Sequence, residues 1–135
     1  APELPVEGTS VETPKKGRLM TQTVGDVTVV DFVDSRILDE NIIKIVVEEL
    51  FGLVNNSYKI KLIIDFQNVD YLSSAVLGKM VALKKLVDEA KGMLRLCNIK
   101  PSIRQIFSIT KLDKLIEIHP DQAAAMKSLQ KGRFV

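Results

Sequence analysis

The chain has 135 residues, a length that suits one domain with a hydrophobic core of ordinary size. Apolar residues make up 46% and charged residues 27%. A net charge of only +2, with the lysines scattered, argues against a nucleic-acid partner. No run reaches the roughly 18 apolar residues that cross a bilayer, so we expect no membrane insertion. The single cysteine cannot form an internal disulfide and favours a reducing, cytoplasmic location.

The chain opens with a segment that is poor in large apolar side chains. Residues 1–17 contain three prolines and two glycines. Such a segment cannot bury enough surface to offset the entropy cost of ordering it, so we expect a flexible tail. The folded domain is then expected at residues 18–135. It begins with two apolar runs, 19–24 and 27–33, which the turn Gly25-Asp26 joins into an antiparallel hairpin.

The rest of the chain alternates between helical and strand patterns. Asp39 is a candidate N-cap for a first helix that reaches residue 55. The remaining expected elements are a strand at 60–66, a helix at 74–91, a strand at 93–97, a helix at 101–110, a strand at 115–118 and a helix at 121–129. This alternation predicts an α/β fold with a mostly parallel sheet of about five strands, an antiparallel N-terminal hairpin and four helices.

Apolar spacing also predicts which side of each helix faces the core. The expected inward residues are Ile42, Ile45, Val46, Leu50, Leu53 and Val54 on the first helix, and Val76, Leu77, Met80, Leu83, Val87 and Ala90 on the second. On the third helix they are Ile103, Ile106 and Phe107.

The most informative stretch runs from Asp65 to Gly78, across the end of a buried strand and the start of the second helix. We expect this helix to begin at Ser74. A serine there has an ordinary structural explanation, because an N-cap hydroxyl stabilises a helix by about 1 kcal/mol. The same position, just past the carboxyl end of a strand, also suits a ligand, a partner or a phosphate. Both interpretations stay open from the residues alone.

This stretch resembles STAS domains, specifically the bacterial anti-sigma factor antagonist family. Members show an apolar strand ending in aspartate, a short loop, an aromatic or apolar pair, and then Asp-Ser-Ser/Thr-Gly-Leu-Gly at the start of a helix. The matching residues here are Leu62-Ile63-Ile64-Asp65, Tyr71-Leu72 and Ser73-Ser74-Ala75-Val76-Leu77-Gly78. Ser73, Ala75 and Val76 depart from the pattern, where the family has aspartate, a second hydroxyl residue and glycine. These departures bear on kinase recognition more than on the fold.

The resemblance implies a regulatory binding module without enzyme activity and without a cofactor. Its unmodified form would bind an anti-sigma factor with a histidine-kinase-like ATPase fold and so free a sigma factor. That kinase would phosphorylate Ser74, with Ser73 as the alternative acceptor, and a serine/threonine phosphatase would restore binding. Asp39 would lie near the switch serine. The expected partner-binding residues are Asp39, Tyr71, Leu72, Ser73, Ser74, Val76 and Lys79.

Other functions have weaker support in the sequence. Asp39, Asp65 and Asp70 could be read as a metal or acid–base cluster, but no histidine lies at ligand spacing. Cys97 fits a small core residue, and His119 fits a turn. The alternative functions are a STAS scaffold subunit of a larger complex, stressosome-like or lipid-transport-like, and a small nucleotide-binding enzyme. The exposed edge of the hairpin leaves open a monomer or a weak homodimer.

Overall fold

The computed structural model describes residues 18–56 and 58–131 of the chain. The tail expected at residues 1–17 lies outside the described residues. Within the described part, no helix is both long enough and apolar enough to cross a membrane.

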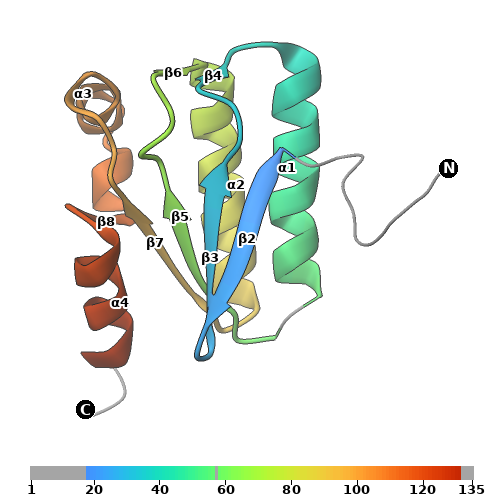
Figure 1. The fold of residues 1–135 in the computed structure, drawn as a ribbon, viewed down its shortest axis with the longest axis vertical. Helices are drawn as coiled ribbons and strands as arrows, with labels where there is room; N and C mark the ends of the chain where they lie inside the picture. Colours follow the sequence, from blue (N-terminus) through green and yellow to red (C-terminus); the bar gives the residue numbers. More distant parts are fainter. Residues whose placement is uncertain (1–17, 57, 132–135) are drawn as a thin grey trace, which may run out of the picture.

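A five-stranded sheet forms the centre of the fold, with the strand order β2-β3-β5-β7-β8 (Figure 1). Its strands are β2 (Leu19–Val24), β3 (Val27–Phe32), β5 (Lys61–Asp65), β7 (Met93–Cys97) and β8 (Glu117–His119). The β2–β3 hairpin is antiparallel, and each of the other neighbouring pairs is parallel. This arrangement confirms the predicted α/β fold with an antiparallel N-terminal hairpin.

Four helices cover the sheet, and they divide between its two faces (Figure 1). They are α1 (Glu40–Asn55), α2 (Ser74–Glu89), α3 (Pro101–Ile109) and α4 (Gln122–Lys131), with a 3-10 turn η1 (Leu112–Lys114) after α3. The larger core joins α1, α2 and α3 to one face of the sheet. A smaller core joins α4 to the other face through Val29, Ile63 and Cys97.

The central strand β5 is covered by helices on both faces, which explains the unbroken apolar run Leu62-Ile63-Ile64 in its sequence. Leu62 and Ile64 face the larger core, whereas Ile63 between them faces α4, and all three are fully buried. A strand covered on both faces has no solvent side, so it does not alternate between apolar and polar residues. Each such side chain contributes about 1.5–3 kcal/mol by leaving water.

Three phenylalanine rings fill the core where β3 and β5 end. The ring centroids of Phe32 and Phe66 are 5.1 Å apart, and those of Phe66 and Phe107 are 6.2 Å apart in an edge-to-face arrangement. All three rings are fully buried. They join β3, β5 and α3 in one packed layer, and the chain segments that leave β3 and β5 begin directly beside it.

Some inward-facing positions differ from the prediction. On α1 the buried residues are Ile43, Val46, Leu50 and Val54, so Ile43 and not Ile45 is the fully inward isoleucine near the start of the helix. Ile42 and Leu53 are partly buried and pack against the larger core. On α3, Ile106 is 37% exposed instead of inward. The last strand begins at Glu117 rather than at 115, because η1 occupies residues 112–114 and Leu115 follows it with 55% of its surface exposed.

Candidate functional site

A pair of short strands ties together the two connections that lead from the sheet to α1 and α2. They are β4 (Arg36–Ile37), which follows β3, and β6 (Tyr71–Leu72), which follows β5, and they pair in parallel. The carbonyl oxygen of Ser35 accepts hydrogen bonds from the backbone N–H groups of Asp70 and Tyr71, at 2.7 and 3.1 Å. The Ser73 N–H donates to the carbonyl oxygen of Ile37 at 3.0 Å. The N-termini of α1 and α2 are therefore held side by side (Figure 1).

Asp39 caps α1, as its sequence position predicts. Its backbone is extended, and its carboxylate Oδ1 accepts from the N–H groups of Asn41 and Ile42, at 2.7 and 3.4 Å. The side chain is exposed, so the carboxylate charge remains in contact with solvent. A negative charge at this end of a helix is favourable, because it faces the positive end of the helix dipole.

Ser73, and not Ser74, is the N-cap of α2. Its backbone is extended, with φ −73° and ψ 145°, and its hydroxyl oxygen accepts from the Ala75 N–H at 3.2 Å. The expectation that Ser74 caps the helix is therefore wrong by one residue. The physical reason is that Ser73 follows directly on β6 and continues its extended backbone, which a cap residue requires. Ser74 then has the helical conformation of the first turn.

The two serines also differ in exposure. Ser74 is exposed, whereas Ser73 is half-buried. Among the described residues the Ser74 hydroxyl has no hydrogen-bond partner, while the Ser73 hydroxyl holds the cap. Of the exposed residues that follow Ser74 in the first turns of α2, Ala75 and Gly78 are small and Lys79 is long and charged. The Ser74 hydroxyl is therefore the more accessible of the two serine hydroxyls.

The other predicted site residues do not all reach the surface. Val76 is fully buried in the larger core, so the expectation that it contacts a partner is wrong, because an apolar residue in the inner stripe of α2 packs against the sheet. Leu72 is partly buried against the same core. Tyr71 is 54% exposed, and Lys79 is exposed on α2. Val76 and Leu72 support the surface from beneath, and Tyr71 and Lys79 form part of it.

Three residues that sequence reasoning did not select also lie at this surface. The Arg36 guanidinium lies over the Tyr71 ring, 4.7 Å from its centroid. Leu38, between Arg36 and the Asp39 cap, is 44% exposed. Lys100, which precedes α3, forms an ion pair with Asp70 in the loop before β6. The pairing of β4 with β6 is what brings Arg36 to Tyr71, and two-residue strands give no periodic signal in a sequence.

The aspartates proposed as a metal or acid–base cluster have separate roles. Asp39 caps α1, Asp70 pairs with Lys100, and Asp65 lies in a buried network. Asp65 accepts hydrogen bonds from the Gln67 N–H at 2.9 Å and from the side-chain amides of Asn98 and Gln122 at 3.1 Å. Across residues 18–56 and 58–131, no three histidine, cysteine or acidic side chains are grouped to hold a metal ion. Asp65 thus joins β5 to the start of α4.

The buried Asp65 carboxylate helps to raise the pKa values of two neighbouring groups, Asp31 and Cys97. Partial burial, together with the charge of Asp65 in register on the next strand, raises the pKa of Asp31. Burial, followed by the charges of Asp65, Asp31 and Asp121, raises the pKa of the Cys97 thiol to about 12. A thiol with that pKa is protonated at neutral pH and is a poor nucleophile.

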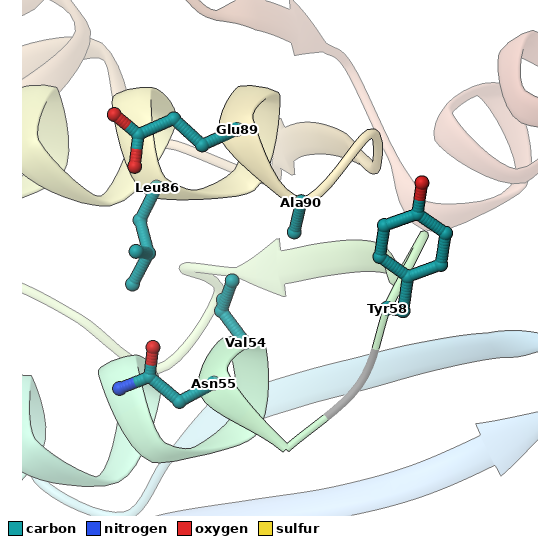
Figure 2. Close-up of a pocket in the computed structure, with 6 residues that line it drawn as sticks. All are labelled: Val54, Asn55, Tyr58, Leu86, Glu89 and Ala90. Carbon is teal, nitrogen blue, oxygen red and sulfur yellow. The ribbon is translucent and has the colours of Figure 1, made fainter.

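A shallow pocket of about 250 Å³ lies at the opposite end of α1 and α2 (Figure 2). Its side chains come mainly from the last turns of these two helices, and Val54, Leu86 and Ala90 point into the space between them (Figure 2). The lining residues are Val54, Asn55, Tyr58, Leu86, Glu89 and Ala90. The pocket is separate from the surface around Ser74, which lies at the N-termini of the same helices.

The chain is similar in sequence to a protein of Bordetella bronchiseptica that is named, provisionally, as the anti-sigma factor antagonist BtrV. The two are 29% identical over 65 residues, which cover 48% of this chain and 56% of the relative. The similarity therefore spans little more than half of the relative's own length.

Solved structures share the fold of the whole described domain. An anti-sigma-factor antagonist (STAS) domain protein from Planctomyces limnophilus matches with a TM-score of 0.76 and 19% identity, over 83% of this chain and 97% of that chain. The phosphorylated form of the Bacillus cell fate determinant SpoIIAA matches with a TM-score of 0.61 and 14% identity, over 82% and 98% of the two chains. At these identities the likeness establishes the fold and leaves function to the site.

The sequence model of the STAS domain matches residues 18–125. The match begins one residue before β2 and ends within α4, so it contains the whole sheet and the capped starts of α1 and α2. The chain belongs to the STAS domain family.

Proposed function

We propose that this protein is an anti-sigma factor antagonist, and that phosphorylation of Ser74 ends its binding to an anti-sigma factor. The observation that carries the proposal is the exposed Ser74 hydroxyl in the first turn of α2, next to the Asp39-capped start of α1. The docking surface consists of Asp39, Tyr71, Ser74 and Lys79, with Arg36 and Leu38 beside them. We call this set the Ser74 surface.

Accessibility favours Ser74 over Ser73 as the acceptor. A kinase must bring the γ-phosphate of ATP in line with a free hydroxyl, and the Ser74 hydroxyl is exposed and unbonded among the described residues. Phosphorylation of Ser73 would first have to displace its oxygen from the Ala75 N–H. That exchange costs about 1 kcal/mol of helix stability.

The fold can accept a phosphate at Ser74 without unfolding. Position 74 lies at the N-terminus of α2, where the helix dipole favours a negative group by about 0.3–1 kcal/mol. A phosphate adds about two negative charges at neutral pH. Its effect is therefore expected at the interface, where it repels or obstructs a partner that binds the unmodified surface.

The residue before the proposed acceptor, Ser73, carries no charge. Where the family has an aspartate directly before the acceptor, this chain has the neutral Ser73, so the residue that precedes Ser74 adds no carboxylate to repel the phosphate. The partner we propose is an anti-sigma factor with a histidine-kinase-like ATPase fold that also acts as the kinase. A serine/threonine phosphatase would reverse the modification. In this role the protein is a binding module, not an enzyme, it needs no cofactor, and it works in the cytoplasm.

Phosphate mapping tests the proposal. The protein is incubated with its partner kinase and ATP, and the modified residue is identified by mass spectrometry. We expect phosphate on Ser74 in the wild type, none in Ser74→Ala, and unchanged labelling of Ser74 in Ser73→Ala. If neither serine is labelled by a kinase that is active on another substrate, the switch is wrong. A STAS scaffold subunit without a switch would then be the better description.

A further inference from the structure

The two edges of the sheet are built differently. At one edge, β8 has three residues, and its Glu117 carboxylate lies 3.3 Å from the Arg95 guanidinium and 2.9 Å from the His119 ring. At the other edge, β2 has six residues, Leu-Met-Thr-Gln-Thr-Val, with no charge and no proline. Short length and charge are common protection against edge-to-edge pairing. The β8 edge has both, and the β2 edge has neither.

The β2 strand is also regular along its whole length. All six residues pair with β3 in an unbroken register, from Leu19 opposite Phe32 to Val24 opposite Val27, so no bulge twists the edge away. In residues 18–131 as described, β3 is the one strand that pairs with β2. As far as the described residues go, the backbone groups on the outer side of β2 have no strand partner, and they offer a ladder of donors and acceptors to another strand.

The side chains of β2 are exposed on both faces of the sheet. Five of its six residues are exposed, including Met20 at 51% and Val24 at 42%. Because residues directly opposite each other share a face, Met20, Gln22 and Val24 lie on the α4 side with Asp31, Val29 and Val27. The main contacts of α4 are with β5, β7 and β8, and in Figure 1 β2 lies toward the edge of the sheet that is farther from α4. On this face, α4 therefore packs against other strands than β2.

We propose that β2 pairs with β2 of a second copy of this chain, in antiparallel orientation, so that two sheets join into one. A two-fold axis perpendicular to the sheet keeps equivalent faces on the same side. An even-numbered residue of β2 must therefore lie opposite an even-numbered residue of the second copy, and an odd-numbered residue opposite an odd-numbered one. An axis at Gln22 satisfies this condition. It places Met20 opposite Val24 of the partner subunit, Thr21 opposite Thr23 of the partner subunit, and Gln22 opposite its own equivalent.

The composition of β2 points to a second copy as the occupant. In the Gln22-centred register an apolar residue meets an apolar residue, a hydroxyl meets a hydroxyl, and an amide meets an amide. Such pairs stabilise antiparallel strands, whereas like charges directly opposite destabilise them. The strand carries no charge, so no symmetric pair is repulsive. An axis at Thr21 would instead put Met20 opposite Gln22 of the partner subunit, an apolar residue against an amide.

Charge substitutions test the pairing in the full chain, with the molar mass measured by sedimentation equilibrium. Combining Met20→Lys with Val24→Lys places like charges opposite each other in both symmetric pairs, and we expect the dimer dissociation constant to rise at least tenfold. Combining Met20→Lys with Val24→Glu places opposite charges there, and we expect the dimer to persist. Both positions are exposed, so neither change should disturb the core. Circular dichroism of each variant verifies the fold.

A matched control adds the same two charges elsewhere on the surface. Ile109 is 73% exposed and Leu115 is 55% exposed, and neither lies on β2. Combining Ile109→Lys with Leu115→Lys should leave the dissociation constant unchanged. A wild-type chain that stays monomeric at millimolar concentration would overturn the proposal, as would a dimer that tolerates both lysines on β2. A dimer that forms only after residues 1–17 are deleted would also overturn it, because the chain's own segment would then cover the edge.

Cysteine cross-linking tests the register. The chain's single cysteine, Cys97, is fully buried, so an introduced thiol on β2 is the accessible one. Under mild oxidation, Gln22→Cys should form a disulfide-linked dimer, since residue 22 faces its own equivalent across the axis. Val24→Cys should not, because residue 24 faces Met20 of the partner subunit. Efficient cross-linking of Val24→Cys and none of Gln22→Cys would contradict this register.

Discussion

Replacing the two neighbouring serines one at a time should separate the cap from the free hydroxyl. Ser73→Ala removes the oxygen that accepts from the Ala75 N–H at 3.2 Å, at a half-buried site where water replaces the bond only in part. We expect a loss of about 1 kcal/mol in the free energy of unfolding, which lowers the melting temperature by about 4 °C. Ser74→Ala removes no such bond, so we expect a change within about 0.5 kcal/mol.

Urea unfolding followed by far-ultraviolet circular dichroism measures the difference. The protein concentration must be the same for every variant, because self-association would add to the apparent stability. We expect a lower midpoint for Ser73→Ala with an unchanged slope against urea concentration. Ser73→Asp serves as the matched control and should keep the wild-type midpoint, since aspartate is an equally good N-cap and suits the helix dipole. The assignment of the cap would be refuted if Ser74→Ala were the more destabilised of the two alanine variants.

Three further predictions concern two glycines, the Asp31 carboxylate and the Cys97 thiol. Gly92→Ala should destabilise the protein by about 3 kcal/mol in the same urea assay, because the added Cβ would lie 2.3 Å from the Ile60 carbonyl oxygen. Gly52→Ala is the matched control: its added Cβ would meet no atom within 4 Å, so it should stabilise α1 by about 0.5–1 kcal/mol. The pKa of Asp31 is raised in the folded state, so the folded protein holds this proton more tightly than the unfolded chain does and loses stability as the pH rises above 3.8. Asp31→Asn removes the charge, so it should raise the urea midpoint at pH 7 and lose this gain below pH 3.8. The Cys97 thiol is fully buried and has a pKa of about 12, so it should react with a disulfide reagent at pH 8 no faster than the protein opens to expose it.

The major elements were predictable because their patterns are strong. The run Leu62-Ile63-Ile64 is short, apolar and closed by an aspartate, which indicates a strand buried on both faces. The inward positions of α2 follow a helical period over four turns. Five of the six predicted residues, from Val76 to Val87, are buried, and the sixth, Ala90, is the C-cap and is partly buried against the same core. Gly25-Asp26 marked the hairpin turn, where Gly25 has φ +65°.

The site was predictable only in part, since its details depend on contacts between segments distant in the sequence. Pairing of β4 with β6 brings Arg36 to Tyr71, and neither two-residue strand is long enough to show a period. The extended backbone of β6 continues through Ser73, which makes Ser73 the cap of α2 instead of Ser74. Two consecutive serines are equally good cap candidates, so the sequence alone does not show which of them is the cap. Val76 is buried because it lies in the inner stripe of α2, and the helical period of the sequence is enough to place it in the core.

The affinity of the protein for its anti-sigma factor, measured by calorimetry, tests the proposed switch most directly. Ser74→Glu adds a charge to the Ser74 surface, and Ser102→Glu adds the same charge to an exposed serine in the first turn of α3 as the matched control. We expect Ser74→Glu to weaken binding at least tenfold, about 1.4 kcal/mol, and Ser74→Ala and Ser102→Glu to bind like the wild type. Wild-type affinity in Ser74→Glu, or an equal loss in Ser102→Glu, would contradict a charge switch at Ser74.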